Sequence, residues 1–526
     1  MAFAPDAKLA GLSWLQALFL AGVCGAMFPL AYPKFDLYPL AFFALAPLFY
    51  LAEAGRGRQA FLGGLLAGAL TNGIGYRFLS ISLREFGGFS APLAMLGVVL
   101  VATYQGLRTG LWIYLLHIAR RRAWPLWLAA PVIEVGLELV YPYLFISHHA
   151  SALYRVPHYI QIADLFGVYG VSAAVVLGNV LVYELAMTFL GKRGPHSHKL
   201  TLGLVMVQVL VIAYGCYRVR EVDATAAAAP VKRIGLIQPS FGAREKNTGL
   251  GRGPGQLDAQ VQIDRQIELS REVARSADLL LWPEATYPFL ISRTADKLST
   301  LPVHRDYEVP VLFGAHTGQR GGRLGSATWN SALLVDKDQK IRGRYDKNFL
   351  VWFSESLPFS DVLPFLKRLF PNASPFTPGT DVTLFPWAGF SIAPSICNDD
   401  IVPAYTLRLA GKPANLLVNL TNDAWFGDSD EPYFHLSLST FRAVESHLYL
   451  VRDTNSGVSS LTDAAGRIIE QTPVTVYSHQ PISRAWEVRM MPARQTPYRR
   501  MGNLFAYLCL TIAAGTVLIR RAHGRE

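Results

Sequence analysis

The chain has 526 residues, of which 51% are hydrophobic and only 17% are charged, and its mean hydropathy of +0.25 is high for a water-soluble protein. This composition excludes an intrinsically disordered protein and argues against a purely soluble enzyme. The net charge of +11 would suit a nucleic-acid-binding protein, but much of the Lys and Arg flanks long apolar runs, where membrane topology explains it better. We therefore expect a membrane protein with no nucleic-acid partner.

Eight apolar runs predict membrane-spanning helices, because most of them are close to the about 20 residues that cross the hydrocarbon core of a bilayer. The second, fifth and eighth are short for a span. The first could instead be a signal peptide, but further apolar runs follow it at once, which favours a span. The runs are Leu12–Ala31, Leu37–Leu51, Phe61–Leu79, Leu93–Ile118, Trp124–Val140, Val168–Leu190, Leu200–Tyr217 and Leu504–Ile519.

The basic residues around these runs predict the orientation of the chain. With the N-terminus in the cytoplasm, the cytoplasmic side would hold twelve Lys and Arg and the other side only four, as the positive-inside rule requires. We therefore expect a seven-helix transmembrane bundle over residues 1–220, an extracytoplasmic domain over residues 221–500, and a final helix with a cytoplasmic tail over residues 501–526. The twelve are Lys8, Arg56, Arg58, Arg120, Arg121, Arg122, Lys192, Arg193, Lys199, Arg520, Arg521 and Arg525, and the four are Lys34, Arg77, Arg84 and Arg155.

Several polar side chains lie in or beside the apolar runs. Charges inside a membrane are costly and mark functional sites by default. The alternative, which we favour, is that they pair inside the bundle or reach toward its ends. They are Asn72, Arg108, Glu134, Glu138 and Glu184. The adjacent His148 and His149 do not share a helix face and have no further ligand set, so we expect no metal there.

From about Arg233 the pattern changes to short apolar runs that alternate with polar helical stretches, which is typical of an α/β layered domain. Three pairs of apolar residues spaced i,i+4 predict a helix over Leu257–Ala277. Ser240–Gly255 reads as a loop, and its glycines at Gly249–Gly255 lack the context of a phosphate-binding motif. The pairs are Leu257 and Val261, Ile263 and Ile267, and Leu269 and Val273. The predicted strands are Ile234–Gln238, Leu279–Trp282, Val311–Ala315, Ser331–Asp336, Phe390–Ser395 and Leu416–Asn419.

Three segments of this domain place reactive side chains at strand ends: Glu284, Lys347 and Cys397. Cys397 is the only one of the four cysteines that lies outside the apolar runs. A thiol is a poor nucleophile until it is deprotonated; a carboxylate can accept its proton, and a lysine ammonium can stabilise a thiolate or an oxyanion. The three residues together predict a cysteine-nucleophile site. Taken singly, each has a structural alternative: a strand-to-loop turn, a solvated lysine and a buried core thiol.

The order of these segments resembles the nitrilase superfamily, and together with the apolar runs the chain resembles the apolipoprotein N-acyltransferase family. The matching segments are WPEAT (282–286), YDKNFLVWFSE (345–355), SICNDD (395–400), NDAWFGDS (422–429), RAVES (442–446), TNSGV (454–458) and the stretch 164–172. The resemblance implies an eight-helix transmembrane bundle that carries a nitrilase-like αββα sandwich domain. It implies that Glu284 is the general base, Lys347 the stabilising lysine and Cys397 the nucleophile. Glu355 matches a second glutamate, and Asp399 falls where many members have glutamate.

The resemblance also implies an activity. Family members transfer an acyl chain from a phospholipid, through a cysteine thioester, to the α-amino group of the N-terminal diacylglyceryl-cysteine of a lipoprotein. For this chain we expect phosphatidylethanolamine as donor, a diacylglyceryl-modified apolipoprotein as acceptor, and no metal or other cofactor. We also expect a monomer in the bacterial inner (cytoplasmic) membrane with its catalytic domain in the periplasm.

The apolar residues after Lys347 suit a site that opens to lipid. Phe349, Trp352 and Phe353 are predicted to form a lid over substrate access, and the alternative is that they are ordinary core or strand residues. Two other functions stay open. A membrane-tethered nitrilase-type amidase would use the same triad on a small amide, and a catalytically inactive membrane scaffold or transporter would not use it at all.

Overall fold

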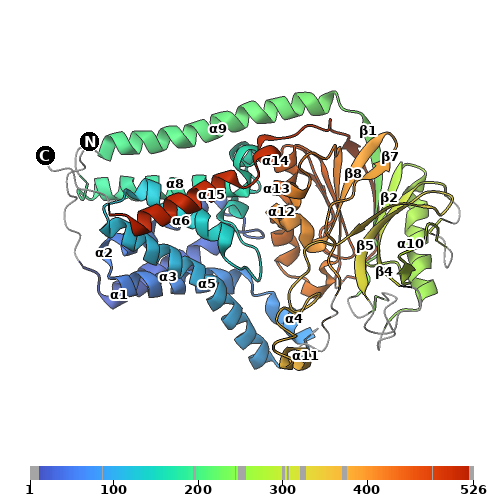
Figure 1. Cartoon of the computed structure of the whole chain (residues 1–526), viewed down its shortest axis with the longest axis horizontal. Helices are drawn as coiled ribbons and strands as arrows, with labels where there is room; N and C mark the ends of the chain where they lie inside the picture. Colours follow the sequence, from blue (N-terminus) through green and yellow to red (C-terminus); the bar gives the residue numbers. More distant parts are fainter. Residues whose placement is uncertain are drawn as a thin grey trace. The chain divides into compact units, whose positions relative to one another are not determined.

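The computed structural model describes residues 11–85, 87–193, 197–242, 245–246, 256–298, 303–304, 307–319, 327–369, 373, 376–476 and 478–520. The chain divides into two compact units, each described below by itself (Figure 1). The first unit comprises Met1–Arg84, Gly88–Arg220 and Met501–Glu526, and the second comprises Glu85–Gly87 and Glu221–Arg500. Lys8, Gly249–Gly255, Arg521 and Arg525, which entered the sequence analysis, lie outside the described residues.

The described part of the first unit is mostly helical, and each of the eight apolar runs contains helix, but turns interrupt Leu37–Leu51 and Phe61–Leu79. Four segments are long and apolar enough to cross a membrane: Trp14–Ala31, Ala91–Arg121, Ala163–Phe189 and His198–Ala227. Tyr38–Ala54 and Leu504–Leu518 are shorter apolar helices. The helices are α1 (Trp14–Met27), α2 (Ala46–Ala54), α3 (Gly57–Gly75), α4 (Leu79–Glu85), α5 (Ala91–Arg121), α6 (Leu126–Val140), α7 (Pro157–Ile160), α8 (Ala163–Phe189), α9 (Ser197–Ala227) and α15 (Leu504–Leu518), with 3₁₀ turns η1 (Phe28–Ala31), η2 (Tyr38–Phe42) and η3 (His149–Leu153).

Glycines let α3 and α5 approach closely. A Cβ on Gly68 would come within 2.8 Å of the Gly106 Cα, and one on Gly106 within 2.5 Å of the Ala69 nitrogen. A Cβ on Gly64 would likewise lie 2.8 Å from the Thr109 oxygen. Small residues four apart on facing helices usually let helices pack closely in lipid. Close packing matters there because the hydrophobic effect does not drive helices together in a membrane.

The second unit is built on two sheets. The first sheet has the strand order β13-β1-β2-β4-β5-β6, with the short β3 beside β4, and the second has the order β12-β11-β10-β9-β8-β7. Strands β1 and β2, and strands β8 and β9, pair in parallel, whereas β1 and β13 are antiparallel. The strands are β1 (Val231–Gln238), β2 (Leu279–Trp282), β3 (Ile291–Ser292), β4 (Val311–Gly318), β5 (Thr328–Val335), β6 (Ile341–Asp346), β7 (Phe385–Trp387), β8 (Phe390–Ile396), β9 (Leu416–Thr421), β10 (Leu450–Thr454), β11 (Ser460–Thr462), β12 (Ile468–Gln471) and β13 (Ile482–Arg489).

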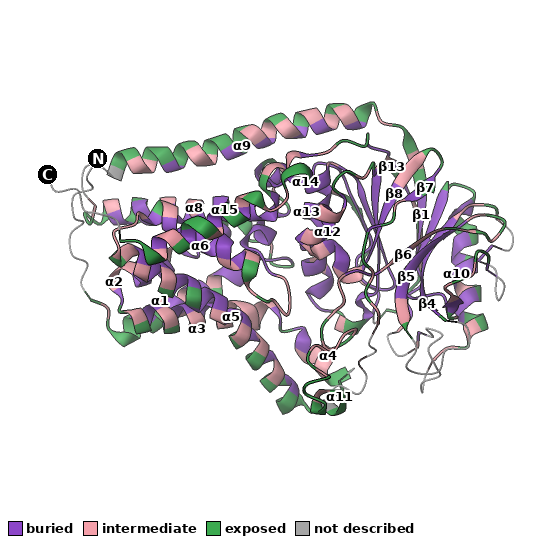
Figure 2. Ribbon diagram, in the orientation of Figure 1, coloured by how far each residue is buried: buried purple, intermediate pink, exposed green. Residues whose placement is uncertain are grey.

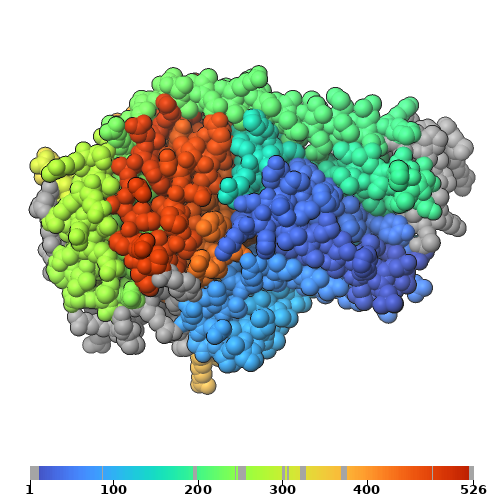
Figure 3. Space-filling model, turned by 180° about the vertical axis from the view of Figure 1, so that it is seen from behind, coloured from blue at the N-terminus to red at the C-terminus, as the bar shows by residue number. Residues whose placement is uncertain are grey.

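The two sheets pack face to face, with contacts between β1 and β10 and between β5 and β8, and helices cover their outer faces. Figure 1 shows α10 (Ala259–Ala274) on one side and α12 (Pro403–Arg408) and α13 (Glu431–Ser446) on the other. The central strands are buried (Figure 2). In Figure 3, α10 and the strand β13, more than 200 residues apart in sequence, lie side by side, in agreement with their contacts. The remaining short helices are α11 (Phe365–Leu369) and α14 (Pro497–Met501).

The six predicted strands are confirmed, with shifts of a few residues at their ends. The predicted helix is confirmed but shorter, because the Asp258 side chain caps it by accepting from the Gln260 N–H at 2.8 Å. Leu257 therefore lies before the helix, and Val261 is 49% exposed rather than part of the apolar face. Ile263 and Ile267 are buried against the first sheet as predicted.

Candidate active site

The three predicted catalytic residues follow strands of both sheets. Glu284 lies two residues after β2, Lys347 directly after β6, and Cys397 directly after β8, where it begins the 3₁₀ turn η4 (Cys397–Ile401). All three segments lie in the second unit. The strand ends therefore supply the base, cation and thiol from three separate parts of the chain.

Lys347 joins two carboxylates. Its Nζ donates to Glu284 Oε1 at 3.2 Å and to the Glu355 carboxylate at 2.8 Å, and the residue is 1% exposed. The Asn330 amide on β5 donates to the same two carboxylates, at 2.7 Å to Glu284 and 3.2 Å to Glu355. Burial lowers the pKa of Lys347, but Cys397, Glu284 and Glu355 outweigh this and hold the pKa well above its usual value. Lys347 is therefore a permanent ammonium at neutral pH.

The main chain at Glu284 is held by a close approach of β4. A Cβ on Gly314 would lie 2.6 Å from the Glu284 Cα and 2.5 Å from the Ala285 nitrogen, so only glycine fits at this position. Ala285 itself has φ +49. On the preceding strand, the Trp282 indole N–H donates to Ser270 of α10 at 2.9 Å, which fixes the strand against its covering helix. These contacts fix the main chain at Glu284 and therefore the direction in which its side chain projects from the end of the sheet.

Cys397 sits at a sharp change of backbone direction, with φ +46. The Asn419 amide on β9 donates to its carbonyl oxygen at 3.1 Å, which holds the turn. Burial raises the pKa of the thiol well above its usual value, the Glu284 charge raises it further, and Lys347 lowers it. The thiol is therefore neutral at rest, and its proton has to leave during the attack on a substrate rather than before it.

Asp399 ties the turn at Cys397 to the segment that carries Lys347. Its carboxylate accepts from the Tyr345 hydroxyl at 2.6 Å, from the N–H groups of Asn348 and Phe349 at 3.1 and 2.8 Å, and from the N–H of Ile396 at 3.0 Å. Burial raises the pKa of Asp399 to about 6, against the hydrogen bonds and Lys347, which lower it. At pH 7 it is thus an acceptor for four donors, and the geometry gives it a positioning part.

The predicted lid residues follow Lys347 in a loop. The loop folds back on itself, because Glu355 Oε2 accepts from the Val351 N–H at 3.0 Å. Trp352 is 42% exposed, while Phe349 and Phe353 are half-buried. Beyond them Phe359, Val362 and Phe365 are exposed by 57% to 78%. This stretch is therefore an exposed apolar surface and not part of the core.

Sequence reasoning missed a second ion network next to η4. His435 of α13 contacts Asp400 at 2.9 Å and Asp423 at 3.3 Å, and Arg452 of β10 reaches Asp423 at 3.1 Å. Burial lowers the pKa of His435, but the two aspartates outweigh this and raise it to about 9. Asp423 lies in the segment 422–429, one of those that resemble the family. That resemblance is the signal by which the network could have been found. The network holds η4 in place through Asp400, which belongs to that turn.

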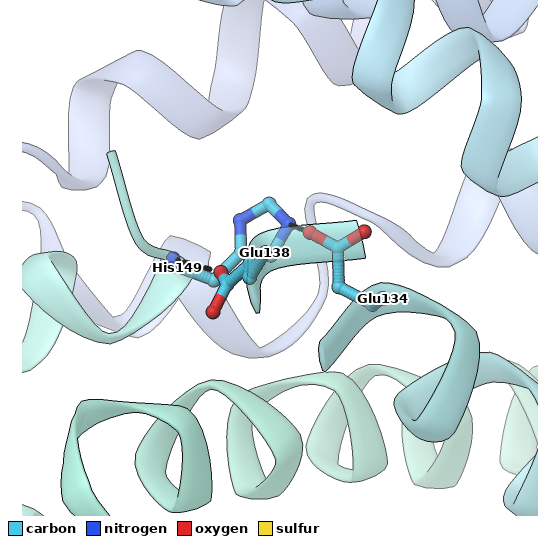
Figure 4. A group of neighbouring side chains, drawn as sticks. All are labelled: Glu134, Glu138 and His149. Atoms are coloured by element: carbon cyan, nitrogen blue, oxygen red, sulfur yellow. Dashed lines mark hydrogen bonds and ion pairs between the residues drawn. The ribbon is translucent and has the colours of Figure 1, made fainter. Parts of the chain in front are cut away.

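The polar residues of the apolar runs are paired within the first unit. Arg108 forms an ion pair with Glu134, and His149 Nε2 lies 2.8 Å from Glu134 Oε1 (Figure 4). Glu138 accepts from the His149 N–H at 3.2 Å and contacts His148 Nδ1 at 3.1 Å. The expectation that these histidines have no further ligand set is therefore wrong, because Glu134, Glu138 and His149 offer ligand atoms within 4.8 Å of one another, beside the Arg108 guanidinium that pairs with Glu134. Asn72 bonds the Gly68 carbonyl at 2.7 Å, and Glu184 pairs with Arg193 at 2.8 Å.

Known proteins share this organisation. A family model described as the apolipoprotein N-acyltransferase N-terminal domain matches residues 24–181, and a carbon-nitrogen hydrolase model matches residues 247–475. The apolipoprotein N-acyltransferase of Geobacter metallireducens is 30% identical over 505 residues, which is 94% of this chain and 93% of that protein. The Pseudomonas aeruginosa protein of the same name is 30% identical over 473 residues, 86% of this chain and 87% of that protein. Among solved structures, an amidase from Nesterenkonia sp. has a TM-score of 0.35 and 18% identity, covering 49% of this chain and 91% of the amidase.

Proposed function

Since the chain belongs to the apolipoprotein N-acyltransferase family, we propose that it transfers an acyl chain from a phospholipid to the α-amino group of the N-terminal diacylglyceryl-cysteine of lipoproteins, through a thioester on Cys397. The observation that carries this proposal is the Lys347 ammonium between the Glu284 and Glu355 carboxylates, 3.2 and 2.8 Å away, beside the half-buried Cys397 thiol. Covalent acyl transfer requires a base, a cation and a thiol close together.

In the first half-reaction, Cys397 Sγ attacks the ester carbonyl of the phospholipid and the thiol proton passes to Glu284. The Lys347 ammonium stabilises the oxyanion of the tetrahedral intermediate. When the intermediate collapses, the C–O bond breaks, the leaving alkoxide takes the proton from Glu284, and a lysophospholipid departs. The acyl chain remains as a thioester on Sγ.

In the second half-reaction, the neutral α-amine of the lipoprotein attacks the thioester carbonyl and passes a proton to Glu284. The Lys347 ammonium again faces the oxyanion. Collapse breaks the C–S bond, the sulfur regains the proton from Glu284, and the acyl chain leaves as an amide. Protons are exchanged only between Glu284 and the reacting atoms, so the cycle needs no external acid or base.

Glu355 and Asp399 act as positioning residues in this scheme. Glu355 accepts from Lys347 and from the Val351 N–H, so it orients the ammonium and anchors the lid loop together. Asp399 bonds the main chain on both sides of the site, at Ile396 and at Phe349. A carboxylate with several buried donors keeps its neighbours in one arrangement.

Both substrates are lipids, so the proposal includes a membrane location. Support comes from large apolar side chains exposed on the helices of the first unit, including Leu15 (81%), Phe19 (71%), Leu100 (62%) and Leu210 (61%), which would be unfavourable in water. Figure 2 shows α9 exposed or half-buried along most of its length. We propose eight spans, with the catalytic domain of residues 221–500 in the periplasm and the chain, as a monomer, in the inner membrane.

The lid belongs to the same proposal. Phe349, Trp352 and Phe353, with the exposed apolar stretch after them, would contact the acyl chains or the membrane surface and admit phosphatidylethanolamine as donor. The support is the exposure of Trp352 and Phe359, by 42% and 70%, since a soluble domain rarely exposes neighbouring large apolar residues without a partner.

Intact-mass measurement of the purified protein after exposure to phosphatidylethanolamine tests the function. The wild type should gain one acyl mass that neutral hydroxylamine removes, because a thioester is labile to it and an amide is not. Cys397→Ala should gain none, and Cys216→Ala, a half-buried cysteine on α9, is the matched control that should behave as the wild type. An adduct that persists in Cys397→Ala would refute the thioester, and the amidase and scaffold alternatives both predict no acyl adduct from phospholipid.

A further inference from the structure

A second lysine is buried at the same site. Lys246 follows β1 in a turn that the Gly242 and Glu245 main chain closes: the Lys246 N–H donates to the Gly242 carbonyl at 3.1 Å, and the Leu257 N–H donates to the Glu245 carbonyl at 2.7 Å. The residue is only 5% exposed. Lysine is almost never fully buried without a partner, so the burial of Lys246 has to be explained by the groups around its ammonium.

The partners of Lys246 belong to the candidate active site. Its Nζ donates to the main-chain carbonyl of Glu284 at 3.1 Å. When the Asn422 amide is oriented with its oxygen toward the lysine, it accepts from Nζ at 2.9 Å and from the Trp425 indole at 3.1 Å. Asn422 directly follows β9, so one ammonium links the segment after β2 to the segment after β9.

The charges of the site explain why a second cation is buried there. Glu284 and Glu355 both pair with Lys347, which leaves one negative charge without a counter-charge among these three groups. A buried charge that lacks compensation is strongly unfavourable. The Lys246 ammonium supplies the positive charge missing among Glu284, Glu355 and Lys347, while the Asp399 carboxylate is stabilised by its own four donors.

The state of Lys246 depends on its surroundings. Burial lowers its pKa to about 8, Glu284, Cys397 and Glu355 act to raise it, and Lys347 acts to lower it. The positive charge is therefore present below about pH 8 and is lost as the pH rises through that value. Cys397 and Lys347, whose pKa values lie well above their usual ones, change little over this range.

We propose that Lys246 is a positioning residue of the acyl-transfer site, whose ammonium fixes the main chain of Glu284 and balances the negative charge of the two glutamates beside Cys397. This rests on the proposed function, because it assigns Lys246 to the same thioester chemistry. Without the ammonium, the Glu284 carbonyl loses a charge-assisted donor, and the Glu284 carboxylate is held less firmly in the place where it accepts the Cys397 proton.

The test measures acylation of Cys397 by phosphatidylethanolamine alone, without lipoprotein, between pH 6 and pH 10. Lys246→Met should slow acylation by about 10- to 100-fold at pH 7, since displacement of a reacting group by about 1 Å can cost about 10²-fold in rate. In the wild type the rate should fall above about pH 8. Lys246→Arg keeps its charge over the whole range and should restore most of the rate and remove that fall. Lys337→Met, on the exposed side chain that pairs with Glu308, is the matched control.

The outcomes separate the two proposals. A wild type that forms no hydroxylamine-labile adduct refutes the proposed function whatever Lys246 does. If the wild type is acylated and Lys246→Met keeps both its rate and its pH profile, Lys246 has no part in the site. A Lys246→Arg variant as slow as Lys246→Met would overturn the charge argument. Should Lys246→Met unfold, the pH profile of the arginine variant decides alone, because a purely structural lysine would leave the alkaline fall in place.

Discussion

Replacing Lys347 by Met would remove the cation that two buried carboxylates share. The Met side chain has nearly the length of the lysine stem, so the change is chiefly one of charge. Glu284 and Glu355 would then lose the ammonium that bonds both of them and keep only Lys246 as a nearby cation, and the Asn330 amide would be their remaining common donor. Breaking a buried ion pair by removing one partner costs about 3–5 kcal/mol, and a proton shared between the two acids would recover part of this.

The same change should be more damaging to catalysis than to folding. Loss of one preorganised donor to an oxyanion slows a reaction by about 10²–10³-fold, and Lys347→Met also removes a donor that positions the Glu284 carboxylate. We therefore expect acylation of Cys397 to fall by at least about 10²-fold. The assay is intact-mass measurement of the acyl-enzyme against time, with thermal unfolding in detergent followed in parallel.

A second substitution separates stability from catalysis. Glu355→Gln in the Lys347→Met background removes one of the two uncompensated carboxylates, so it should recover part of the lost stability and none of the lost acylation. Lys337→Met controls for the loss of an exposed lysine. Acylation of Lys347→Met within a few-fold of the wild-type rate would refute the role of the lysine at the oxyanion. A double variant no more stable than the single one would refute its role as the counter-charge of the two glutamates.

Three further changes probe the base, the backbone and the lid. Glu284→Gln should slow formation of the acyl-enzyme by about 10²–10⁴-fold, the usual contribution of a positioned proton acceptor, with little change in melting temperature. Gly314→Ala should displace the Glu284 main chain, since its Cβ would lie 2.5 Å from the Ala285 nitrogen; an unchanged acylation rate and melting temperature would contradict the close approach. Replacing Trp352 and Phe353 by Ser should slow turnover on bilayer phospholipid more than on short, soluble esters, and equal losses on both would favour a packing role.

Two of the three strands that end at the catalytic residues were predicted, because their signals are local, whereas β6, which ends before Lys347, was not. The run Leu279–Trp282 is apolar and stops at a proline, and Phe390–Ser395 stops before the cysteine turn; both predictions are confirmed by β2 and β8. In contrast, β13 was missed because it has no continuous apolar run: its alternation, with Trp486 buried and Glu487 exposed, is interrupted by the polar pair Ser483 and Arg484. Its pairing with β1, where Arg489 faces Val231 and Ile482 faces Gln238, joins positions 244 to 258 residues apart.

The polar contacts that complete the site had no local signal. Asn330 is the third residue of β5 and lies just before the predicted strand Ser331–Asp336, where no local pattern marks it, yet its amide bonds both glutamates. Lys246 lies in what reads as a polar loop, where a solvated lysine is the default expectation. These side chains are buried because the topology brings particular strand ends together. No single segment of the sequence tells which strand ends will meet.

The protonation states of the site form one consistent arrangement. If Cys397 rested as a thiolate, a third negative charge would lie beside Glu284 and Glu355, and two lysines would not neutralise it. The neutral thiol avoids this, and transfer of its proton to Glu284 moves negative charge from the carboxylate to the reacting oxygen without changing the total. The charge opposite Lys347 is thus constant from the resting state through the tetrahedral intermediate, so the ammonium can stay in place and little reorganisation is needed as the reaction proceeds. A site balanced in this way should react slowly with small thiol reagents that offer no developing oxyanion, yet quickly with an ester, because only the ester places charge where the ammonium already is.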